Sequence, residues 1–383
     1  MSARTFDFVV VGAGVFGAWC ACELLRLGHS VLLLDGNGPA HSRAGSGGES
    51  RIIRMGYGAD ALYARWAMRS LEKWKAIERR LSRPIFRPTG MLWLARCGDT
   101  YVSQTRDVLK EVGVEHECLN AAALTNEYPQ ISPDGIEWAL REPGSGVLMA
   151  RQAVQALVAD AIGGGLEYRT HSVMPPVVKA SLDHVETISG DRISAGAFVF
   201  ACGAWLPKLF PELLAERISP TRQEVYFFAP PSGDVSFASP AMPAWLDHAA
   251  LVYGLPDLEN RGFKLSIDRH GPAFDPDAGV RLASAERLTM AHEYLQMRFP
   301  KMRGAVLAES RVCQYANTSS GDFIIDRHPQ IDNVLIVGGG SGHGFKHGPM
   351  VGEYASRLLT SGAVVEPRFS LASKSTTPAR RVY

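Results

Sequence analysis

The sequence predicts an α/β fold, α+β overall, with a nucleotide-binding domain made from three separate chain segments and a smaller domain with a mainly antiparallel sheet. Apolar, β-branched runs lead into glycine-rich turns at the N-terminus, near residue 200 and near residue 335, as buried parallel strands do. Stretches between them alternate polar and apolar residues, which is typical of a half-exposed sheet.

The composition limits the class of protein. A chain of 383 residues is long for one core and suits two domains. The formal net charge is +1, from 40 basic and 39 acidic residues, so we expect neither nucleic acid nor an anionic membrane as a partner. With 46% hydrophobic and 21% charged residues, the chain is an ordinary globular protein rather than a disordered one.

Targeting and metal signals point to an intracellular protein without a metal. No apolar run reaches the roughly 18 residues of a membrane-spanning helix, and residues 1–7 lack the pattern of a secretory signal. We therefore expect a cytoplasmic protein without a membrane partner. The six cysteines contain no CxxC pair, which argues against a disulfide scaffold and against structural zinc.

The first segment carries a dinucleotide-binding pattern. A strand at residues 8–11 enters the glycine turn of residues 12–17, a helix follows to about residue 27, and a second strand at residues 30–34 ends in Asp35. This order and spacing are those of a Rossmann-like unit.

Each residue of that pattern has a physical purpose. Gly12 permits the tight turn, Gly14 lets the backbone approach a pyrophosphate, and Gly17 lets the helix pack closely on the strand. The helix N-terminus supplies N–H groups and positive potential for phosphates. Asp35 can accept from a ribose hydroxyl, which favours NAD or FAD over NADP, and this unit alone leaves NAD and FAD open.

The loop at residues 44–49 is rich in glycine and leads into a basic segment with Arg51 and Arg54. A loop of this kind can lie against a flat ring, and the alternative is a solvated linker.

The rest of the chain completes the two domains. We expect helices at residues 61–81, 101–112, 150–162, 286–299 and 349–359, and strands within residues 86–94, 198–205, 223–229, 249–254, 262–267 and 334–337. Residues after Pro367 read as a polar surface arm. The predicted nucleotide-binding domain covers residues 1–80, 145–215 and 305–383, and the substrate domain covers residues 81–144 and 216–304.

Over nearly its whole length the chain resembles the monomeric sarcosine oxidase and N-methyltryptophan oxidase group of the D-amino-acid-oxidase-type (DAO) flavoproteins. The resemblance rests on the motifs GAGVFG with Asp35, GESRIIR, FACGAW, YGLP followed by GFKL, RVCQY, FIIDRHP and SGHGFKHGP. It implies FAD as cofactor and oxidation of the C–N bond of an N-substituted or cyclic amino acid. The resulting imine would hydrolyse, and O2 would be reduced to H2O2.

The resemblance also implies cofactor contacts. These fall on Gly12, Gly14, Val15, Phe16, Gly17, Asp35, Ser46, Arg51, Cys202, Gly203, Trp205, Cys313, Gly342, Gly344, Phe345 and Lys346. Cys313 matches the family cysteine that bonds covalently to the 8α-methyl of the flavin. Its thiol must reach the anionic form, and Arg311 would help if its side chain points the same way. The alternative is a core cysteine in a strand.

Six residues match the catalytic positions of the family. Arg54 and Lys346 would hold the substrate carboxylate, the arginine through its planar fork, and their alternatives are an interdomain salt bridge and a surface lysine. Arg51 would lie beside the flavin ring. Tyr253 and Tyr315 would line the substrate cavity, and their alternative is ordinary aromatic core packing. Lys264 would stabilise superoxide electrostatically, and its alternative is a snorkelling strand lysine.

The sequence departs from the sarcosine-type pattern at two places. The loop at residues 45–49 lacks the histidine pair of those members, and Asp268 stands where they carry a second cavity histidine, with His270 two residues further on. Asp268 would bind a cationic amino group, or it is a turn residue that points to water. Sarcosine itself is therefore in doubt, whereas an amino or imino acid is still expected.

Two other functions stay open. One is a dehydrogenase or desaturating enzyme of the same fold with another electron acceptor. The other is an FAD-binding subunit of a hetero-oligomeric oxidase, although we expect a monomer because clamp and cysteine lie on one chain. His343 and His347 have helical spacing, but one such pair is weak evidence for a metal.

Overall fold

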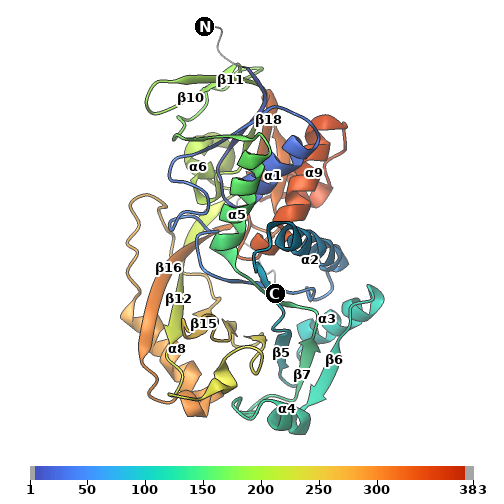
Figure 1. Cartoon of the computed structure of the whole chain (residues 1–383), viewed down its shortest axis with the longest axis vertical. Coiled ribbons are helices and arrows are strands. Elements are labelled where there is room, and N and C mark those ends of the chain that lie inside the picture. Colours follow the sequence, from blue (N-terminus) through green and yellow to red (C-terminus); the bar gives the residue numbers. More distant parts are fainter. Residues whose placement is uncertain (1–4, 376–383) are drawn as a thin grey trace.

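The computed structural model describes residues 5–375. Within them the strands form three sheets, of seven, eight and three strands. The seven-stranded sheet and its helices occupy the upper part of Figure 1, and the eight-stranded sheet occupies the lower part. The predicted fold class is confirmed: parallel and antiparallel sheets occur in one chain.

The seven-stranded sheet joins the three segments that end in glycine loops. Its order is β17–β18–β11–β1–β2–β9, and β10 pairs with β11 at the side. Strands β18, β11, β1, β2 and β9 are parallel, and most of the central residues are fully buried, as two-sided cover requires. The bounds are β1 (Phe6–Val11), β2 (Val31–Asp35), β9 (Glu167–Thr170), β10 (His184–Glu186), β11 (Arg192–Phe200), β17 (Ile324–His328) and β18 (Ile331–Gly338).

Three helices pack together beside this sheet. Helix α1 (Val15–Arg26) contacts both α5 (Ala150–Gly163) and α9 (Gly348–Thr360), and Figure 1 shows the three side by side. Close approach is possible because Gly352 lacks a side chain: a Cβ there would lie 2.6 Å from the backbone of Trp19. The N-terminus of α1 is thereby held at the end of β1.

The eight-stranded sheet has the order β16–β12–β15–β14–β13–β5–β7–β6, with one parallel pair, β13 with β5. Helix α8 (Ala285–Arg298) covers its aromatic core, in which Trp245, Phe263 and Phe299 are fully buried. The bounds are β5 (Met91–Ala95), β6 (Glu117–Asn120), β7 (Trp138–Glu142), β12 (Ser219–Phe228), β13 (Ala244–Asp247), β14 (Val252–Leu255), β15 (Phe263–Ile267) and β16 (Leu307–Asn317).

A small third sheet connects the two larger ones. It consists of β3 (Arg51–Ile53), β8 (Gly146–Leu148) and β4 (Phe86–Arg87). The remaining helices are α2 (Ala61–Leu81), α3 (Thr100–Glu111), α4 (Ala121–Glu127), α6 (Leu206–Leu209) and α7 (Pro211–Leu214). The division into two domains at the predicted boundaries stays a prediction, and β16 pairs with β12 although its residues fall in the range assigned to the first domain.

The predicted surface arm after Pro367 is wrong for its described part. Phe369 is fully buried and Leu371 nearly so. Arg368 donates to the carboxylates of Asp60 and Asp322, which ties the segment to the start of α2. Burial of these two apolar side chains offsets the conformational entropy that this mostly polar stretch loses when it becomes ordered. Residues 376–383 of this prediction lie outside the described residues, as do residues 1–4 of the predicted N-terminus.

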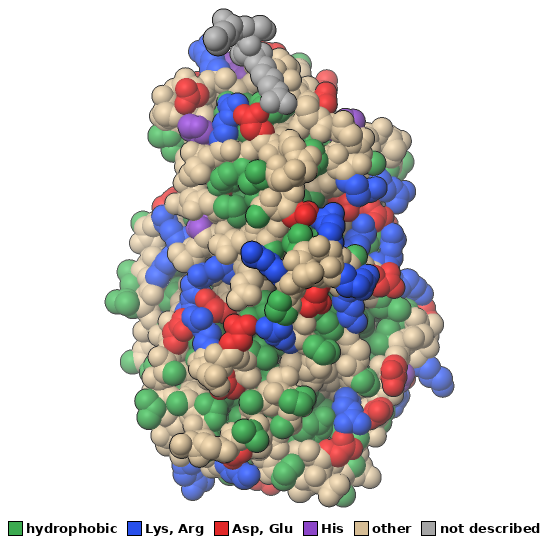
Figure 2. Space-filling view, viewed as in Figure 1, with side chains coloured by type: hydrophobic (Ala, Val, Ile, Leu, Met, Phe, Trp, Pro, Cys, Tyr) green, Lys and Arg blue, Asp and Glu red, His purple; other side chains and the backbone are tan. Residues whose placement is uncertain are grey.

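The surface carries both signs of charge. On the face shown in Figure 2, Lys and Arg side chains are interspersed with Asp and Glu side chains. None of the helices in residues 5–375 is long and apolar enough to cross a membrane. The cytoplasmic location stays a prediction.

Candidate active site

The glycine turn after β1 leaves no room for side chains. Gly12 has φ 103°, and a Cβ there would lie 2.6 Å from the carbonyl oxygen of Ala201. A Cβ on Gly17 would lie 1.8 Å from the carbonyl oxygen of Gly12. The turn and the start of α1 are thus pressed against each other as the sequence predicts. The Val15 amide at the helix start donates to Ser46 Oγ at 2.9 Å.

Asp35 ends β2 and is fixed by backbone amides. Its Oδ2 accepts from Ala13 N at 2.8 Å, and its Oδ1 accepts from Asn37 N at 2.8 Å and from Gly38 N at 3.0 Å. Three amides hold the carboxylate at the C-terminal edge of the parallel sheet. This is where a ribose lies in folds of this kind.

A cavity of about 440 Å³ opens at this edge. A crevice outside the carboxyl ends of parallel strands is the usual ligand site of such sheets. Most of the predicted cofactor residues line it: Gly12, Gly14, Val15, Phe16, Asp35, Ser46, Arg51, Cys202, Gly203, Trp205, Gly342, Gly344 and Phe345. Gly17, Cys313 and Lys346 do not line it. His171, Lys208 and Asp277 also line it and carry no signal in the sequence.

A second cavity, of about 60 Å³, adjoins the first. The two share Arg51, Tyr315, Gly342 and Phe345 in their walls. All six predicted catalytic residues line the small cavity: Arg51, Arg54, Tyr253, Lys264, Tyr315 and Lys346. They come from β3 and the residue directly after it, from β14, β15 and β16, and from the short 3₁₀ helix before α9. The fold thus brings together residues that are far apart in the sequence.

Arg54 is 3% exposed and lies between two aromatic rings. Its guanidinium carbon is 4.5 Å from the ring centroid of Tyr57 and 4.6 Å from that of Trp93. The buried carboxylate of Glu142 accepts from Trp93 Nε1 at 2.7 Å and from Met55 N at 2.8 Å. The arginine therefore has fixed side-chain geometry. Sequence reasoning missed Tyr57, Trp93 and Glu142, because no motif marks them.

Lys346 is buried beside Arg54. Its Nζ donates to the Tyr57 hydroxyl at 2.9 Å and to the carbonyl oxygen of His343 at 3.2 Å. Burial lowers the pKa of Lys346 well below its usual range, and the charge of Arg54 lowers it further. A ligand carboxylate would favour the charged lysine and so offset this effect. His343 and His347 both contact the Tyr57 hydroxyl, so this pair serves an internal network.

Lys264 lies on β15 and is 3% exposed. Its Nζ donates to the carbonyl oxygen of Ser50 at 2.9 Å and to Ser50 Oγ at 3.1 Å. Burial lowers the pKa of Lys264 to about 7, and the charge of Arg51 acts in the same direction. A third cavity of about 160 Å³ lies on its other side, lined also by Phe227, Arg261 and Leu258. The lysine is thus a buried cation between two cavities rather than a snorkelling side chain.

Cys313 lies on β16 next to Arg51. Arg51 Nη2 is 3.5 Å from Cys313 Sγ and 2.8 Å from the carbonyl oxygen of Gly45. Arg311, the other expected helper of the thiol, instead pairs with Glu49. The cation beside the thiol is therefore Arg51.

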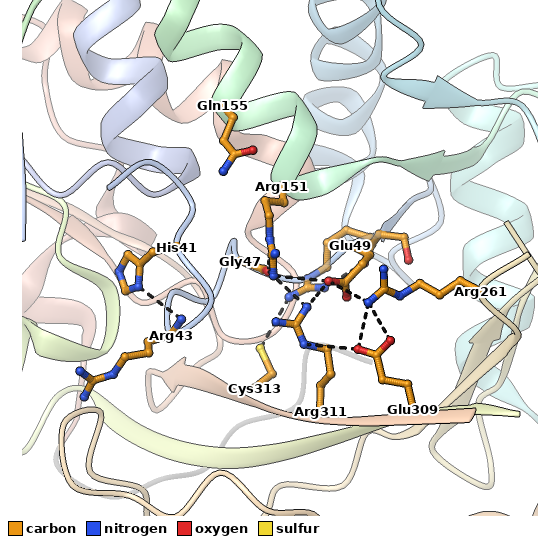
Figure 3. A network of polar contacts seen from close by, with 12 residues as sticks. His41, Arg43, Gly47, Glu49, Arg151, Gln155, Arg261, Glu309, Arg311 and Cys313 are labelled. Atoms are coloured by element: carbon orange, nitrogen blue, oxygen red, sulfur yellow. Dashed lines mark hydrogen bonds and ion pairs between the residues drawn. The ribbon is translucent and has the colours of Figure 1, made fainter. Parts of the chain in front are cut away.

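Glu49 forms ion pairs with the other basic side chains of this region, as Figure 3 shows. It pairs with Arg311, with Arg151 at 3.4 Å and with Arg261 at 3.5 Å, and Glu309 pairs with Arg261 at 2.7 Å. Burial is the largest single influence on the pKa of Glu49 and would raise it, but the hydrogen bond and charge of Arg311 together with the charge of Arg261 outweigh burial, so the pKa lies below its usual value. The loop is fixed by ion pairs and is not a solvated linker.

Asp268 follows β15 and lines the small cavity. It is 6% exposed, so the interpretation of a turn residue that points to water is wrong. Tyr315 Oη donates to Asp268 Oδ1 at 2.9 Å. His270 is not among the residues that line the cavity, and hence it does not replace the missing imidazole.

Residues 5–375 contain no group of three or more His, Cys, Asp or Glu side chains placed to hold a metal ion.

Comparison with protein families matches residues 7–358 to the model described as DAO, FAD dependent oxidoreductase. Monomeric sarcosine oxidase of Bacillus sp. (strain NS-129) is 33% identical, over 93% of this chain and 93% of that protein. Peroxisomal sarcosine oxidase of Homo sapiens is 32% identical, over 96% and 94%. N-methyl-L-tryptophan oxidase of Salmonella arizonae is 28% identical, over 92% and 94%.

Solved structures agree on the fold. L-proline dehydrogenase from P. horikoshii superposes with a TM-score of 0.85 at 20% identity, over 96% of this chain and 97% of that one. The amino acid oxidase NikD of nikkomycin biosynthesis superposes with a TM-score of 0.78 at 21% identity, over 96% and 98%.

Proposed function

Because the chain belongs to the DAO family of FAD dependent oxidoreductases, we propose that it oxidises the C–N bond of an N-substituted or cyclic amino acid, with O2 as electron acceptor. The imine would hydrolyse in water, and O2 would be reduced to H2O2. One observation supports this most: the buried cations Arg54 and Lys346 share a small cavity that adjoins the large one through Arg51 and Tyr315.

The large cavity fits FAD. The tight turn at Gly12 and Gly17 has no space for a side chain, and the start of α1 offers N–H groups and positive potential to a pyrophosphate. Asp35 would accept from the ribose. A bound flavin supplies the acceptor for the electron pair that leaves the substrate.

Cys313 would hold the flavin covalently. The support is its contact at 3.5 Å with Arg51, a residue that lines both cavities. The flavin colour should then stay with the acid-precipitated protein. Full extraction of FAD into the supernatant would contradict the covalent bond.

The substrate carboxylate would bind between Arg54 and Lys346. The amine must be neutral before it can give up the electron pair of the C–H bond. Burial and positive neighbours disfavour an ammonium group, so the cavity itself would lower the pKa of the amine. Tyr253 and Tyr315, which line the same cavity, would enclose the reacting carbon.

Lys264 would act on the oxygen side of the reaction. A positive charge fixed in a buried place stabilises the negative charge that develops as O2 is reduced. Its position at the wall shared by the 60 Å³ and 160 Å³ cavities supports this role.

A screen of N-methyl, cyclic and primary amino acids for anaerobic bleaching of the flavin tests the proposal, followed by measurement of peroxide in air. We expect bleaching by at least one amine that carries a carboxylate, and one peroxide for each amine oxidised. If no such amine bleaches the flavin, the proposed reaction is refuted. Bleaching without peroxide would show a dehydrogenase with another acceptor. Gel filtration with turnover of the isolated chain tests the proposed monomer.

A further inference from the structure

The small cavity contains one acid among its cations. Arg51, Arg54, Lys264 and Lys346 line it, and Asp268 is the carboxylate among the lining residues. A buried acid is costly unless it is paired or hydrogen-bonded. Asp268 meets this condition through the Tyr315 hydroxyl, and it places a negative side chain in the wall of the proposed substrate cavity.

Asp268 is held in place from two sides. Its backbone N donates to the carbonyl oxygen of Leu251 at 2.7 Å, and its Oδ1 accepts from the Tyr315 hydroxyl at 2.9 Å. Tyr315 also lines both cavities. Tyr315 thus holds the Asp268 carboxylate at the cavity wall, and Tyr315 itself borders the proposed flavin site.

The charge of Asp268 reaches other groups of the cavity. It favours the charged form of Lys346, against the burial and the Arg54 charge that lower the pKa of this lysine. Burial is the largest cause that raises the pKa of Tyr253, and the charge of Asp268 is the next. A cationic group on the substrate would meet an opposite charge at Asp268, because the other charged side chains that line this cavity are basic.

The reacting nitrogen is a poor partner for this acid. Oxidation requires a neutral amine, whereas a neighbouring carboxylate favours the ammonium form. Pairing of Asp268 with the reacting nitrogen would therefore oppose the reaction. A cation elsewhere on the substrate meets no such conflict.

We propose that Asp268 determines substrate specificity by binding a second, non-reacting cationic group, so that the substrate class is an N-substituted amino acid with an additional ammonium or guanidinium group. Arg54 and Lys346 hold the carboxylate and Asp268 holds the distal cation. This inference rests on the proposed function.

Two matched pairs of compounds test it, each pair alike in shape and different in charge. The first pair is N-methylornithine and N-methylnorleucine, which carry the difference on the side chain. The second is N-(3-aminopropyl)glycine and N-butylglycine, which carry it on the nitrogen. The measurement is the rate constant of anaerobic flavin reduction divided by the apparent Kd. In the wild-type protein we expect the cationic member of at least one pair to be preferred by roughly ten- to a hundredfold, the range of a hydrogen bond to a charged group.

Variants assign the preference to the carboxylate. Asp268→Asn keeps the shape and removes the charge, so the preference should fall to about onefold or reverse, and Asp268→Glu should retain part of it. Asp183→Asn, which removes an exposed partner of Lys179, should leave the preference unchanged. The ratio within a pair is insensitive to a general loss of folded protein.

The outcomes separate the two proposals. If no amine with a carboxylate, N-methylglycine included, bleaches the wild-type flavin, the proposed function fails. If N-methylglycine bleaches it and neither cationic compound is preferred, the function stands and the role of Asp268 is overturned. Equal losses for both members of a pair in Asp268→Asn would also overturn it, because the acid would then serve Lys346 alone.

Discussion

Arg54→Lys should weaken substrate capture while it leaves the protein folded. The guanidinium lies between the rings of Tyr57 and Trp93 at 4.5 and 4.6 Å and is 3% exposed. Lysine keeps the charge but loses the planar fork that binds a carboxylate through two hydrogen bonds. One lost hydrogen bond to a charged group costs about 1.5–3 kcal/mol, and weaker stacking on the rings adds about 0.5–2 kcal/mol.

The sum, about 2–5 kcal/mol, corresponds to a loss of roughly thirtyfold to several thousandfold in the rate constant of flavin reduction divided by the apparent Kd. Anaerobic stopped-flow measurement over a range of substrate concentrations gives this quantity. Arg298→Lys is the matched control, since Arg298 is equally buried, donates to the carbonyl oxygens of Ser132 and Asp134, and lies outside the cavities. A loss below threefold in Arg54→Lys, or an equal loss in the control, would refute the carboxylate clamp.

Four further changes test other parts of the site and fold. Lys264→Met should slow reoxidation of the reduced flavin by O2 far more than its reduction by amine; equal effects in stopped-flow traces would exclude the oxygen role. Because the pKa of Lys264 is about 7, the lysine is charged below that pH, so wild-type reoxidation should slow as pH rises through it, and a flat profile would argue against a role for the charge. Cys313→Ser should release FAD into the acid supernatant, whereas colour retained in the pellet would place the bond elsewhere. Gly12→Ala should abolish FAD retention, because a Cβ would lie 2.6 Å from the carbonyl oxygen of Ala201 at φ 103°; normal flavin content would be contrary to the tight-turn argument. Phe369→Ala should lower the free energy of unfolding by about 3–5 kcal/mol, and a change below about 1 kcal/mol in chemical denaturation would mean that the C-terminal segment adds little to the core.

The sequence predicted the parts of the fold that local patterns encode. The glycine turn at residues 12–17 and the apolar runs of β1, β11 and β18 carry strong periodicity and strict steric demands. Strands β6, β9 and β10 were not predicted, because each has only three or four residues and gains its order from a neighbouring strand. The same holds for Phe369, whose burial depends on long-range packing.

The sequence predicts which residues come together at the small cavity, but it does not predict how their side chains are arranged. The motif matches name six predicted catalytic residues, and all six line one cavity. Side-chain direction lies beyond sequence patterns: Arg311 pairs with Glu49 while Arg51 approaches Cys313, and Asp268 faces the cavity instead of water. The ring partners of Arg54 are Tyr57, which lies between β3 and α2, and Trp93 on β5. No motif marks either residue, so only the folded chain shows them.

Anaerobic titration of the flavin with a matched pair, N-methylglycine and dimethylamine, tests the central claim most directly. The two amines differ only in the carboxylate that Arg54 and Lys346 would bind. The amino acid found in the substrate screen and its decarboxylated analogue serve as a second pair of the same kind. The account predicts complete bleaching by the amino acid at concentrations at which the analogue leaves the flavin oxidised. Equal bleaching by both members, or bleaching by neither, would contradict it.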